Sequence, residues 1–384
     1  MSDYDLDLAS VSVHADDEFS LVSDVATPLH VSTIYKYNSD PDKLVRAKDH
    51  DIRLAGPDER VYSRFGNPVT SRVEAVLSGI LGGHAVVYSS GLSAFTAAIT
   101  HLQPKRVAIA DGYHGCHNVL AILSRFGGGA SIESIDHYDP SLSANDLFHI
   151  ETPINPTGIA LDLEKAVSFA HARGAKVLVD ATFAPPPIQN PFDFGVDLVM
   201  HSATKYFGGH SDLLAGVLVT KDPAVRDQLL QDRGILGLQP GNMESWLLLR
   251  SLRTYKLRVT QQSTSATKIA RFLADALASS SIPALKQVHH SSLQTEPFVA
   301  KQMPNGMHSP AFSIEVASSD LARKLPSRLK LFHHSTSLGG VESLIEWRAV
   351  SDKHVPETLL RLSIGVEDTD DLIADLKQGL LSLS

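Results

Sequence analysis

Short apolar runs alternate with amphipathic stretches through the middle of the chain. The runs are bounded by turn residues and have the length of buried strands, at residues 85–88, 106–110, 176–179 and 196–200. Between them lie stretches that the pattern predicts to be helical, at residues 71–81, 93–99 and 163–173. This alternation of strand and helix predicts an α/β fold with a mostly parallel central sheet flanked by helices.

The two ends of the chain have a different pattern. Residues 1–60 are acidic, carry few periodic apolar positions and include a charged segment at 40–60, which predicts an arm that is ordered only against another surface. Beyond about residue 234, amphipathic patterns predict helices at residues 243–258, 265–278 and 371–381 within a smaller α+β unit. The expected division is an arm at 1–60, a central domain at 61–234 and a C-terminal domain at 235–384.

Charge and cysteine content narrow the functional classes. The 384 residues carry a formal net charge of −9, which argues against a nucleic-acid partner because phosphate contacts require a basic surface. The single cysteine, Cys116, allows no internal disulfide and fits a reducing compartment. The acidic N-terminus lacks the form of a signal peptide, and no apolar run reaches membrane-spanning length. We therefore expect a cytoplasmic protein with no membrane partner.

Polar side chains directly follow two of the expected strands. One strand runs into Asp180, and the next is followed by Ser202, Thr204 and Lys205. Ligands bind at the carboxyl ends of strands in open α/β sheets. An amine and an acid at this edge suit pyridoxal 5'-phosphate (PLP), which needs an amine for covalent attachment and an acid facing its pyridine nitrogen. Ser202 and Thr204 are then natural phosphate ligands, because hydroxyls near a turn can share the charge of a dianion.

The residues around Lys205 resemble a known family. They match the signature of the Cys/Met-metabolism family of PLP-dependent enzymes through SATKY at residues 202–206, GGHSD at 208–212 and Gly216. This family comprises cystathionine γ-synthases, γ-lyases and β-lyases. The resemblance implies fold type I, PLP attached to Lys205, Asp180 facing its ring nitrogen, and a PLP-binding domain at 61–234.

A second signature of the family lies near the N-terminus. In the family, the Tyr and Arg of the heptad YSRFGNP, here residues 62–68, reach across a dimer interface to the partner's cofactor phosphate. The resemblance gives these roles to Tyr62 and Arg64, although such a turn alone would fit a plain subunit interface. Residues 25–33 resemble the start of the family's N-terminal arm, which lies on a neighbouring subunit. The resemblance implies a homo-oligomer, a dimer with shared active sites that assembles into a tetramer.

Two further segments resemble the family's cofactor contacts. Ser90, Gly91 and Leu92 turn into an expected helix whose free N–H groups and dipole favour an anion. They match the SSG(M/L) phosphate cradle of the family. Tyr113 stands in a D-x-Y pattern whose aromatic residue lies flat on the cofactor ring in the family, with a hydroxyl that can transfer protons. Tyr113 alone would equally fit a core or rim aromatic residue.

The resemblance also implies a site for the substrate. The segment ETPINPTG at 151–158 resembles a family segment whose amide bonds both the cofactor's phenolic oxygen and a substrate carboxylate, a role that falls to Asn155. Two more family motifs, SLGGVESL and LRLSIGVED, contain Ser337 and Arg361. A guanidinium presents a planar fork to a carboxylate. The resemblance therefore assigns the α-carboxylate of an amino-acid substrate to Arg361, helped by Ser337.

Two other patterns suggest ligands that the sequence does not support. His114, Cys116 and His117 lie close together, but a tetrahedral zinc site needs four ligands, and no second Cys or His pair stands at matching spacing. We expect no metal. The glycines at 127–129 lack the GxGxxG context of a dinucleotide site.

Three positions depart from the family pattern. Thr336 replaces the Glu that usually precedes the Ser-Leu-Gly-Gly motif, Ala181 replaces an Asn after the cofactor Asp, and Trp347 interrupts a Pro-containing turn. Together with YHGCH at 113–117, these departures resemble a fungal side branch of the cystathionine γ-synthases. Some members of that branch use O-acetylhomoserine with a carbon or nitrogen nucleophile.

The predicted activity follows from this resemblance. We expect γ-replacement on an O-acyl-L-homoserine, with a thiol or a carbon nucleophile such as a β-keto acid, and with Lys205 removing the Cα proton. The enzymatic alternative is a cystathionine γ- or β-lyase that cleaves a C–S bond. A non-enzymatic binding scaffold is a third interpretation, against which the intact Lys205, Asp180, Tyr113 and Arg361 argue.

Overall fold

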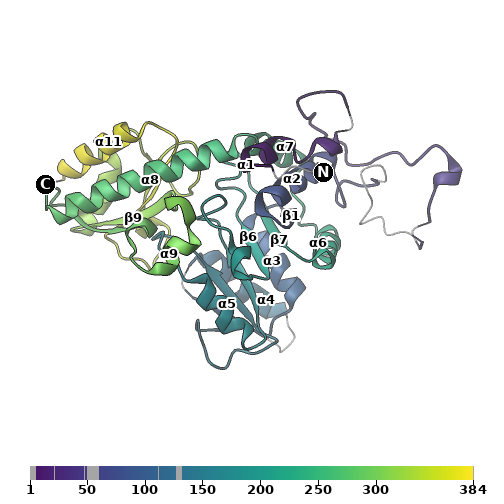
Figure 1. Ribbon diagram of the computed structural model, residues 1–384, viewed down its shortest axis with the longest axis horizontal. Helices are drawn as coiled ribbons and strands as arrows, with labels where there is room; N and C mark the ends of the chain where they lie inside the picture. The colour runs from purple at the N-terminus through teal and green to yellow at the C-terminus, as the bar shows by residue number, and fades with distance from the viewer. Residues whose placement is uncertain are drawn as a thin grey trace.

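Two sheets organise the protein. The computed structural model describes residues 6–20, 22–46, 48–49, 60–110, 112–126 and 132–383. Its first sheet has seven strands in the order β1-β7-β6-β5-β4-β2-β3, and its second has five in the order β10-β11-β12-β9-β8. Figure 1 shows the first sheet in the middle of the chain, covered by helices, and the second in the C-terminal part, with the long helix α8 running from beside α1 and α7 along the second sheet.

The seven-stranded sheet is mixed but mostly parallel. Its strands are β1 (His84–Tyr88), β2 (Arg106–Ile109), β3 (Glu133–Ile135), β4 (Leu147–Glu151), β5 (Lys176–Asp180), β6 (Leu198–His201) and β7 (Gly216–Thr220). Strand β7 is antiparallel to both of its neighbours, β1 and β6, whereas the pairs β6/β5, β5/β4, β4/β2 and β2/β3 are parallel. The predicted α/β fold with a mostly parallel central sheet is confirmed.

The smaller sheet is almost entirely antiparallel. Its strands are β8 (Leu285–His289), β9 (Ala311–Val316), β10 (His333–His334), β11 (Leu344–Trp347) and β12 (Leu359–Ser363). Only β10 and β11 pair in parallel. Buried apolar side chains on one face of this sheet, among them Phe312, Ile314 and Leu362, form a second core with Leu273 of α8 and Leu376 of α11. The domain boundaries at residues 60 and 234 stay a prediction.

Eleven α-helices lie within the described residues. They are α1 (Leu8–His14), α2 (Pro68–Leu81), α3 (Gly91–Leu102), α4 (His114–Phe126), α5 (Leu163–His171), α6 (Pro223–Leu236), α7 (Asn242–Leu252), α8 (Tyr255–Ala278), α9 (Pro297–Gln302), α10 (Ser319–Lys324) and α11 (Thr369–Leu381). None of them is long and apolar enough to cross a membrane. Three predicted features, Asp111, most of the charged segment at 40–60, and Gly127 to Gly129, lie outside the described residues.

The helices predicted at 243–258 and 265–278 are wrong in their boundaries. The first helix, α7, ends at Leu252, and α8 then runs unbroken for 24 residues from Tyr255 to Ala278. At the break, Thr254 leaves the helical region with φ −113° and ψ 14°, and the neighbouring Arg253 turns its guanidinium to Asp16. Apolar positions continue across the break, so the periodic pattern does not reveal it.

Side-chain caps begin the helices that position the site. Asn67 accepts a hydrogen bond from the amide of Val69, with Pro68 at the first position of α2, where its missing N–H costs nothing. Ser90 caps α3 in the same way by accepting from the Ser93 amide, 3.0 Å away. The turn from β1 into α3 is therefore fixed by its own side chains. The amides of Gly91 and Leu92 lie in the first turn of α3, where no intrahelical acceptor exists.

The first helix packs against the body of the protein. Helix α1 docks on α2, where a Cβ on Gly79 would lie 2.6 Å from the Val11 side chain. The buried carboxylate of Asp16 then binds Arg72 of α2 at 2.5 Å and Arg253 at 2.7 Å. Residues 8–16 are thus ordered against another surface, as predicted, and that surface belongs to the same chain. The long-range ion pair that fixes them there does not show in the local periodicity.

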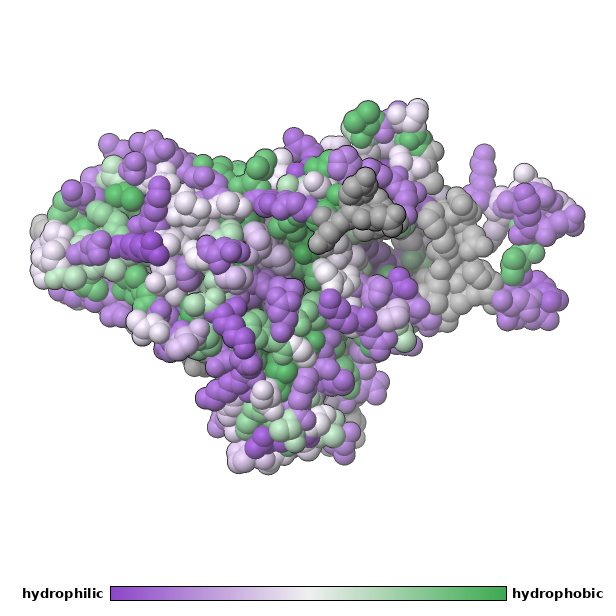
Figure 2. Space-filling view, viewed as in Figure 1, coloured by the Kyte–Doolittle hydropathy of each residue, from purple (hydrophilic) through white to green (hydrophobic). Residues whose placement is uncertain are grey.

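The next segment, at residues 22–46, extends from the body of the protein. Figure 1 shows it as a long trace beyond α2, and Figure 2 shows apolar residues on it among polar ones. The side chains of Val25, Val31, Ile34 and Tyr37 are largely exposed, at relative accessibilities between 68 and 105%. Apolar side chains exposed in this way on an extended segment favour contact with another surface.

Several strands end at the same edge of the larger sheet. Strands β4 and β5 are parallel, with Glu151 opposite Asp180 in the register, and β6 continues the parallel set. Strand β1 has the same direction as β6, because both are antiparallel to β7. The turns that follow β1, β4, β5 and β6 therefore meet at one edge, where ligands bind in open α/β sheets.

Replacing Asp16 with asparagine tests the docking of α1. Burial would raise the pKa of Asp16, but hydrogen bonds and charges from Arg253 and Arg72 lower it below its usual value of 3.8. The substitution leaves two arginines without their carboxylate, so we expect the free energy of unfolding at pH 7 to fall by about 3 kcal/mol. The measurement is denaturant unfolding. Asp16 stabilises the fold only while its carboxylate is ionised. The difference in unfolding free energy between the native protein and the variant should therefore shrink as the pH falls below 3.8 and through the lowered pKa.

Asp7→Asn is the matched control for this test. Asp7 also pairs with a cation from α8, Lys256 at 2.6 Å, but that pair is exposed to solvent. Its removal should leave the unfolding midpoint unchanged within error. Equal effects of the two substitutions would contradict the role given to the buried pair.

Candidate active site

A cavity of about 460 Å³ lies where the strand ends of the larger sheet face the C-terminal residues. One wall comes from the turns at the sheet edge and from α3, with Ser90, Gly91, Leu92, Tyr113, His114, Glu151, Asn155, Asp180, Thr182, Ser202, Thr204 and Lys205. The opposite wall comes from the C-terminal part, with Thr336, Ser337, Leu338, Arg348, Ser351 and Arg361. The cavity thus gathers most of the site residues that the sequence predicts.

Lys205 stands in the turn that follows β6. Its Nζ donates a hydrogen bond to the Ser337 hydroxyl at 2.8 Å, across the cavity from its own strand. Burial lowers the pKa of Lys205 to about 8, and the nearby Arg361 charge adds to this effect, while Glu346 opposes it. An amine with this pKa is partly neutral near physiological pH. It is therefore suited to act as a nucleophile or a base.

Two carboxyl groups lie side by side at the ends of β4 and β5. Asp180 accepts two hydrogen bonds at one oxygen, from the amide of Thr182 at 2.9 Å and from its hydroxyl at 2.6 Å. Glu151 accepts from the amides of Tyr113 at 2.7 Å and Asn155 at 2.6 Å. Burial raises the pKa of both acids, and Asp180 helps to raise that of Glu151 to about 8.

This pair has a consequence for ligand binding. Two buried like charges repel, so the edge favours a proton or a cation facing the acids. Among the described residues, no hydrogen bond is found for the second carboxylate oxygen of Asp180. That oxygen is free to accept from a protonated ring nitrogen. The acids therefore fit a pyridine ring placed between Asp180 and the opposite wall.

The start of α3 provides an anion site beside Ser202. A Cβ on Gly91 would lie 3.1 Å from the Ser202 Cβ, so the two turns are in close contact. Gly216 fixes this arrangement from behind, because a Cβ there would lie 2.1 Å from the carbonyl oxygen of Ser90. Free amides at a helix N-terminus favour a phosphate. The Thr204 hydroxyl, in contrast, is engaged with the backbone of Ala215, donating at 3.2 Å and accepting at 3.0 Å.

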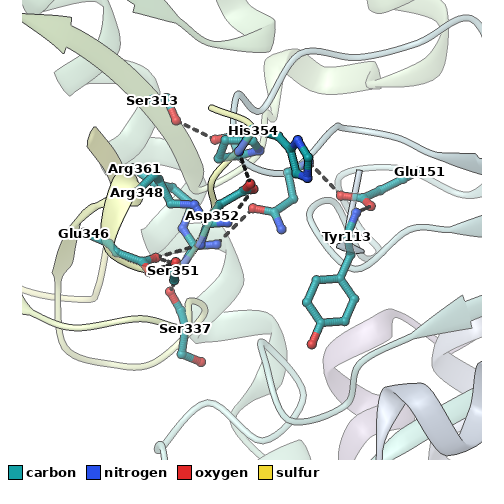
Figure 3. Close-up of polar contacts among 12 residues, drawn as sticks. Tyr113, Glu151, Ser313, Ser337, Glu346, Arg348, Ser351, Asp352, His354 and Arg361 are labelled. Atoms are coloured by element: carbon teal, nitrogen blue, oxygen red, sulfur yellow. Dashed lines mark hydrogen bonds and ion pairs between the residues drawn. The ribbon is translucent and has the colours of Figure 1, made fainter. Parts of the chain in front are cut away.

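Tyr113 and Arg361 flank the cavity from opposite sides (Figure 3). Tyr113 is 40% exposed, and burial of its other part raises the pKa of its hydroxyl. Arg361, on β12, is buried and donates to Asn155 Oδ1 at 2.9 Å, to the Ser337 carbonyl at 2.9 Å and to Glu346 at 2.6 Å. These contacts hold the guanidinium in one orientation, as a carboxylate receptor requires.

Two predicted residues do not reach this cavity. Arg64 donates to the carbonyl of Gly234 and lies over the ring of Phe65, with 4.4 Å from its central carbon to the ring centroid. Tyr62 pairs with Ile34 in an isolated bridge and is 42% exposed. Their roles toward a partner's cofactor stay predictions.

Sequence reasoning gave no individual role to several residues of the cavity. Glu151 stood inside a recognised motif, and its place at a strand end next to Asp180 could have indicated it. Thr182 follows Asp180 by two positions, the spacing of a side chain that bonds its neighbour's carboxylate. Nothing in the sequence indicated Arg348. It lies two positions after its partner Glu346, and an exposed ion pair on one face of a strand would have the same spacing.

The three departures from the family pattern lie in different surroundings. Thr336 lines the cavity next to Ser337. Ala181 is buried behind the cavity, with its amide bonded to the Met200 carbonyl. Trp347 donates to the carbonyl of Glu357 through its indole nitrogen at 2.7 Å. Of the three, Thr336 alone changes the lining of the cavity.

His114, Cys116 and His117 do not share one environment. Cys116 is buried and free, whereas His117 contacts the carbonyl of Ala110 at 3.2 Å. Within the part of the chain that the structure describes, no group of three or more His, Cys, Asp or Glu residues could hold a metal ion.

Comparison with known proteins identifies the family. The model of the Cys/Met metabolism PLP-dependent enzymes matches residues 9–381. The chain is 34% identical to cystathionine γ-lyase of Saccharomyces cerevisiae over 97% of this chain and 96% of that protein. It is also 34% identical to cystathionine γ-synthase of Escherichia coli, over 92% of this chain and 92% of that protein. It is 32% identical to cystathionine β-lyase of Lactococcus lactis, over 93% of this chain and 94% of that protein.

Solved structures give the same result. The structure of yeast cystathionine γ-lyase covers 100% of both chains with a TM-score of 0.86 at 31% identity. That of cystathionine γ-synthase from Xanthomonas oryzae pv. oryzae covers 99% of both with a TM-score of 0.86 at 29% identity. The fold is therefore that of the fold type I PLP-dependent enzymes.

The protein belongs to the Cys/Met metabolism family of PLP-dependent enzymes. This confirms three predictions: the family, PLP as the cofactor, and an enzyme of the transferase or lyase class. The alternative of a non-enzymatic scaffold is set aside. The cavity fits the cofactor on its own evidence, because an amine, an acid pair with a free oxygen, and a helix N-terminus with free amides surround it.

The charge of Arg361 should control the titration of Lys205. Arg361→Met removes a cation that disfavours the protonated amine, so we expect the pKa of Lys205 to rise above about 8. The measurement is the pH dependence of Lys205 acylation by acetic anhydride in the cofactor-free protein, followed by peptide mass spectrometry. Arg323→Met, on the exposed surface of α10, serves as the control and should leave the midpoint in place. An unchanged midpoint in Arg361→Met would refute the coupling.

Proposed function

We propose that the protein catalyses γ-replacement on an O-acyl-L-homoserine, with a thiol or a carbon nucleophile such as a β-keto acid. The observation that carries this proposal is the placement of the Lys205 amine between the Asp180 edge and the Arg361 fork, in a cavity whose other wall is polar. The bond between oxygen and Cγ breaks with release of a carboxylate. A bond from sulfur or carbon of the nucleophile forms at Cγ, and the nucleophile releases its proton.

Each residue of the cavity has a part in this proposal. When bound, PLP supplies an aldehyde that attaches to an amine and a ring that withdraws electrons from the adjacent carbon. Lys205 would hold it, with Asp180 at its ring nitrogen and Tyr113 against its ring. Ser90, Gly91, Leu92, Ser202 and Thr204 would bind its phosphate, together with Tyr62 and Arg64 of a second subunit.

The substrate would be oriented by the C-terminal wall. Arg361 and Ser337, with Asn155, would bind the α-carboxylate, because a fixed guanidinium presents paired donors to it. Lys205, once released from the cofactor, would accept the Cα proton. Its lowered pKa leaves part of the amine neutral and able to do so near pH 8.

The enzymatic alternative is a cystathionine γ- or β-lyase. It is supported by the relatives in yeast and Lactococcus lactis, which are a γ-lyase and a β-lyase. Thr336 lines the cavity where the family usually carries an acid, so this wall is less negative, but the change is common ground between replacement and cleavage and does not separate them.

The assembly and location are also proposals. We infer a homo-oligomer, a dimer with shared active sites that forms a tetramer, from the exposed apolar side chains of Val25, Val31 and Tyr37 and from Arg64 lying outside its own cavity. Cytoplasmic residence is supported by the single, buried cysteine.

Replacing Lys205 with alanine tests the cofactor's attachment. We expect the purified variant to lose the visible absorbance of the bound cofactor, and its turnover to fall by about 10²-fold or more, since both base and attachment point are removed. Absorption spectra and steady-state rates measure this. Lys176→Ala, at the opposite end of β5, is the control and should stay coloured and active. A coloured, active Lys205→Ala would contradict the assignment.

Product analysis separates replacement from cleavage. The protein is incubated with O-acetylhomoserine alone, with cysteine and with a β-keto acid, and the products are identified by mass spectrometry. We expect a condensed product only where a nucleophile is present. Rapid cleavage of cystathionine without any condensed product would instead establish the lyase activity.

A further inference from the structure

A second arginine lies in the wall of the cavity beside Arg361. Arg348 follows β11 directly, and its side chain is only 4% exposed. It lines the cavity together with Ser351 and Thr336. Figure 3 shows the guanidinium groups of Arg348 and Arg361 converging on the same acid, Glu346.

This cluster is unevenly balanced in charge. Glu346 uses one oxygen for both arginines, at 3.0 Å from Arg348 and 2.6 Å from Arg361, while its other oxygen accepts from Ser351 at 2.6 Å. Asp352 is the other acid in contact, at 3.3 Å from Arg348, and its side chain is 13% exposed. Two buried cations thus share one buried carboxylate, and the compensating acid lies farther out.

Arg348 has unused capacity to donate. A guanidinium carries five N–H groups. Within the described residues, one hydrogen bond is found from one terminal nitrogen to Glu346 and one from the other to Asp352, which leaves a second N–H group on each; the Nε is itself buried and has no partner. A buried cation that is incompletely paired is costly unless an anion completes it. In a cavity built for substrates, that anion can be a ligand.

The position of Arg348 indicates which ligand this is. Arg361 is bonded to Asn155 and Ser337, the residues proposed for the α-carboxylate. Among the described residues, the hydrogen bonds found for Arg348 go to Glu346 and Asp352 and not to Asn155 or Ser337. Arg348 lines the cavity with Thr336 and Ser351, apart from the contacts proposed for the α-carboxylate, so a carboxylate bound there would belong to a second molecule.

We propose that Arg348 binds a carboxylate of the incoming nucleophile, so that the protein selects nucleophiles that carry a carboxylate. This inference rests on the proposed γ-replacement and narrows its second substrate to thiol acids or β-keto acids. Neutral thiols and simple ketones lack the group that Arg348 would bind. Arg361 keeps its separate role toward the amino-acid substrate.

The test compares matched nucleophiles with O-acetylhomoserine as the first substrate. The thiol pair is 3-mercaptopropionate and 2-mercaptoethanol, neither of which has an amine that could attach to the cofactor. The carbon pair is acetoacetate and ethyl acetoacetate, and the pair that reacts identifies the source of the carboxylate. We expect the native holoenzyme to have a KM for the acid of its preferred pair about tenfold or more below that for the neutral partner.

Substitutions at Arg348 should remove this preference. In Arg348→Gln the KM for the carboxylated nucleophile should rise about tenfold or more, while the KM for O-acetylhomoserine and the values for the neutral nucleophile stay within about twofold. Arg348→Lys, which keeps the charge but not the planar fork, should show a smaller rise. Arg106→Gln, which disrupts a comparable ion pair with Asp146 away from the cavity, is the control and should keep the preference.

The outcomes distinguish the inference from the proposed function. A preference that survives in Arg348→Gln, or a rise in the KM for O-acetylhomoserine equal to that for the nucleophile, would overturn the inference, because Arg348 would then only support Glu346 and Arg361. If no nucleophile gives a condensed product, the proposed function fails. Calorimetric binding of 3-mercaptopropionate and acetoacetate to the holoenzyme then decides the inference by itself, since neither acid should bind Arg348→Gln as tightly as the native protein.

Discussion

The active site depends on the contact between two turns, one after β6 at residues 205–209 and one before β11 at residues 337–341. A Cβ on Gly339 would lie 2.7 Å from the amide of Tyr206, and the Val341 amide donates to the carbonyl of Gly209. Ser337 adopts φ 86°, a conformation that costs a residue with a side chain about 1–3 kcal/mol. Its hydroxyl accepts from Lys205 and its carbonyl accepts from Arg361, and these two bonds offset the cost.

This contact brings together charges that neither part of the chain could bury alone. The edge of the larger sheet supplies Glu151, Asp180 and Lys205, and the smaller sheet supplies Arg361 and Glu346. Burial raises the pKa of the two acids at the strand ends and lowers that of the lysine, which moves all three toward the physiological range. Proton transfer near neutral pH is the chemistry that such groups can perform.

The sequence predicted those parts of the site that depend on local order. Asp180 ends β5 and Lys205 lies in the turn after β6, so two apolar runs and the rule that ligands bind at strand ends were sufficient to place both residues at one site. Ser337 and Arg361 came from family motifs. The roles of Tyr62 and Arg64 concern a second subunit, and a single chain does not test them.

The parts that sequence reasoning missed depend on distant contacts. The docking of α1 needs Arg72 and Arg253, far along the chain from Asp16. The break before Tyr255 leaves the apolar pattern intact, so it follows from tertiary packing rather than from periodicity. Arg348 and Glu346 resemble an exposed pair in the sequence, and only the closure of the smaller sheet over the cavity buries them.

The chemistry assigned to the cavity requires the cofactor to be attached to Lys205. Reduction of the holoenzyme with borohydride, followed by proteolysis and peptide mass spectrometry, tests this attachment. We expect the mass of the reduced cofactor on the peptide containing Lys205. A reduced cofactor on a different lysine, with the Lys205 peptide unmodified, would refute the role of Lys205.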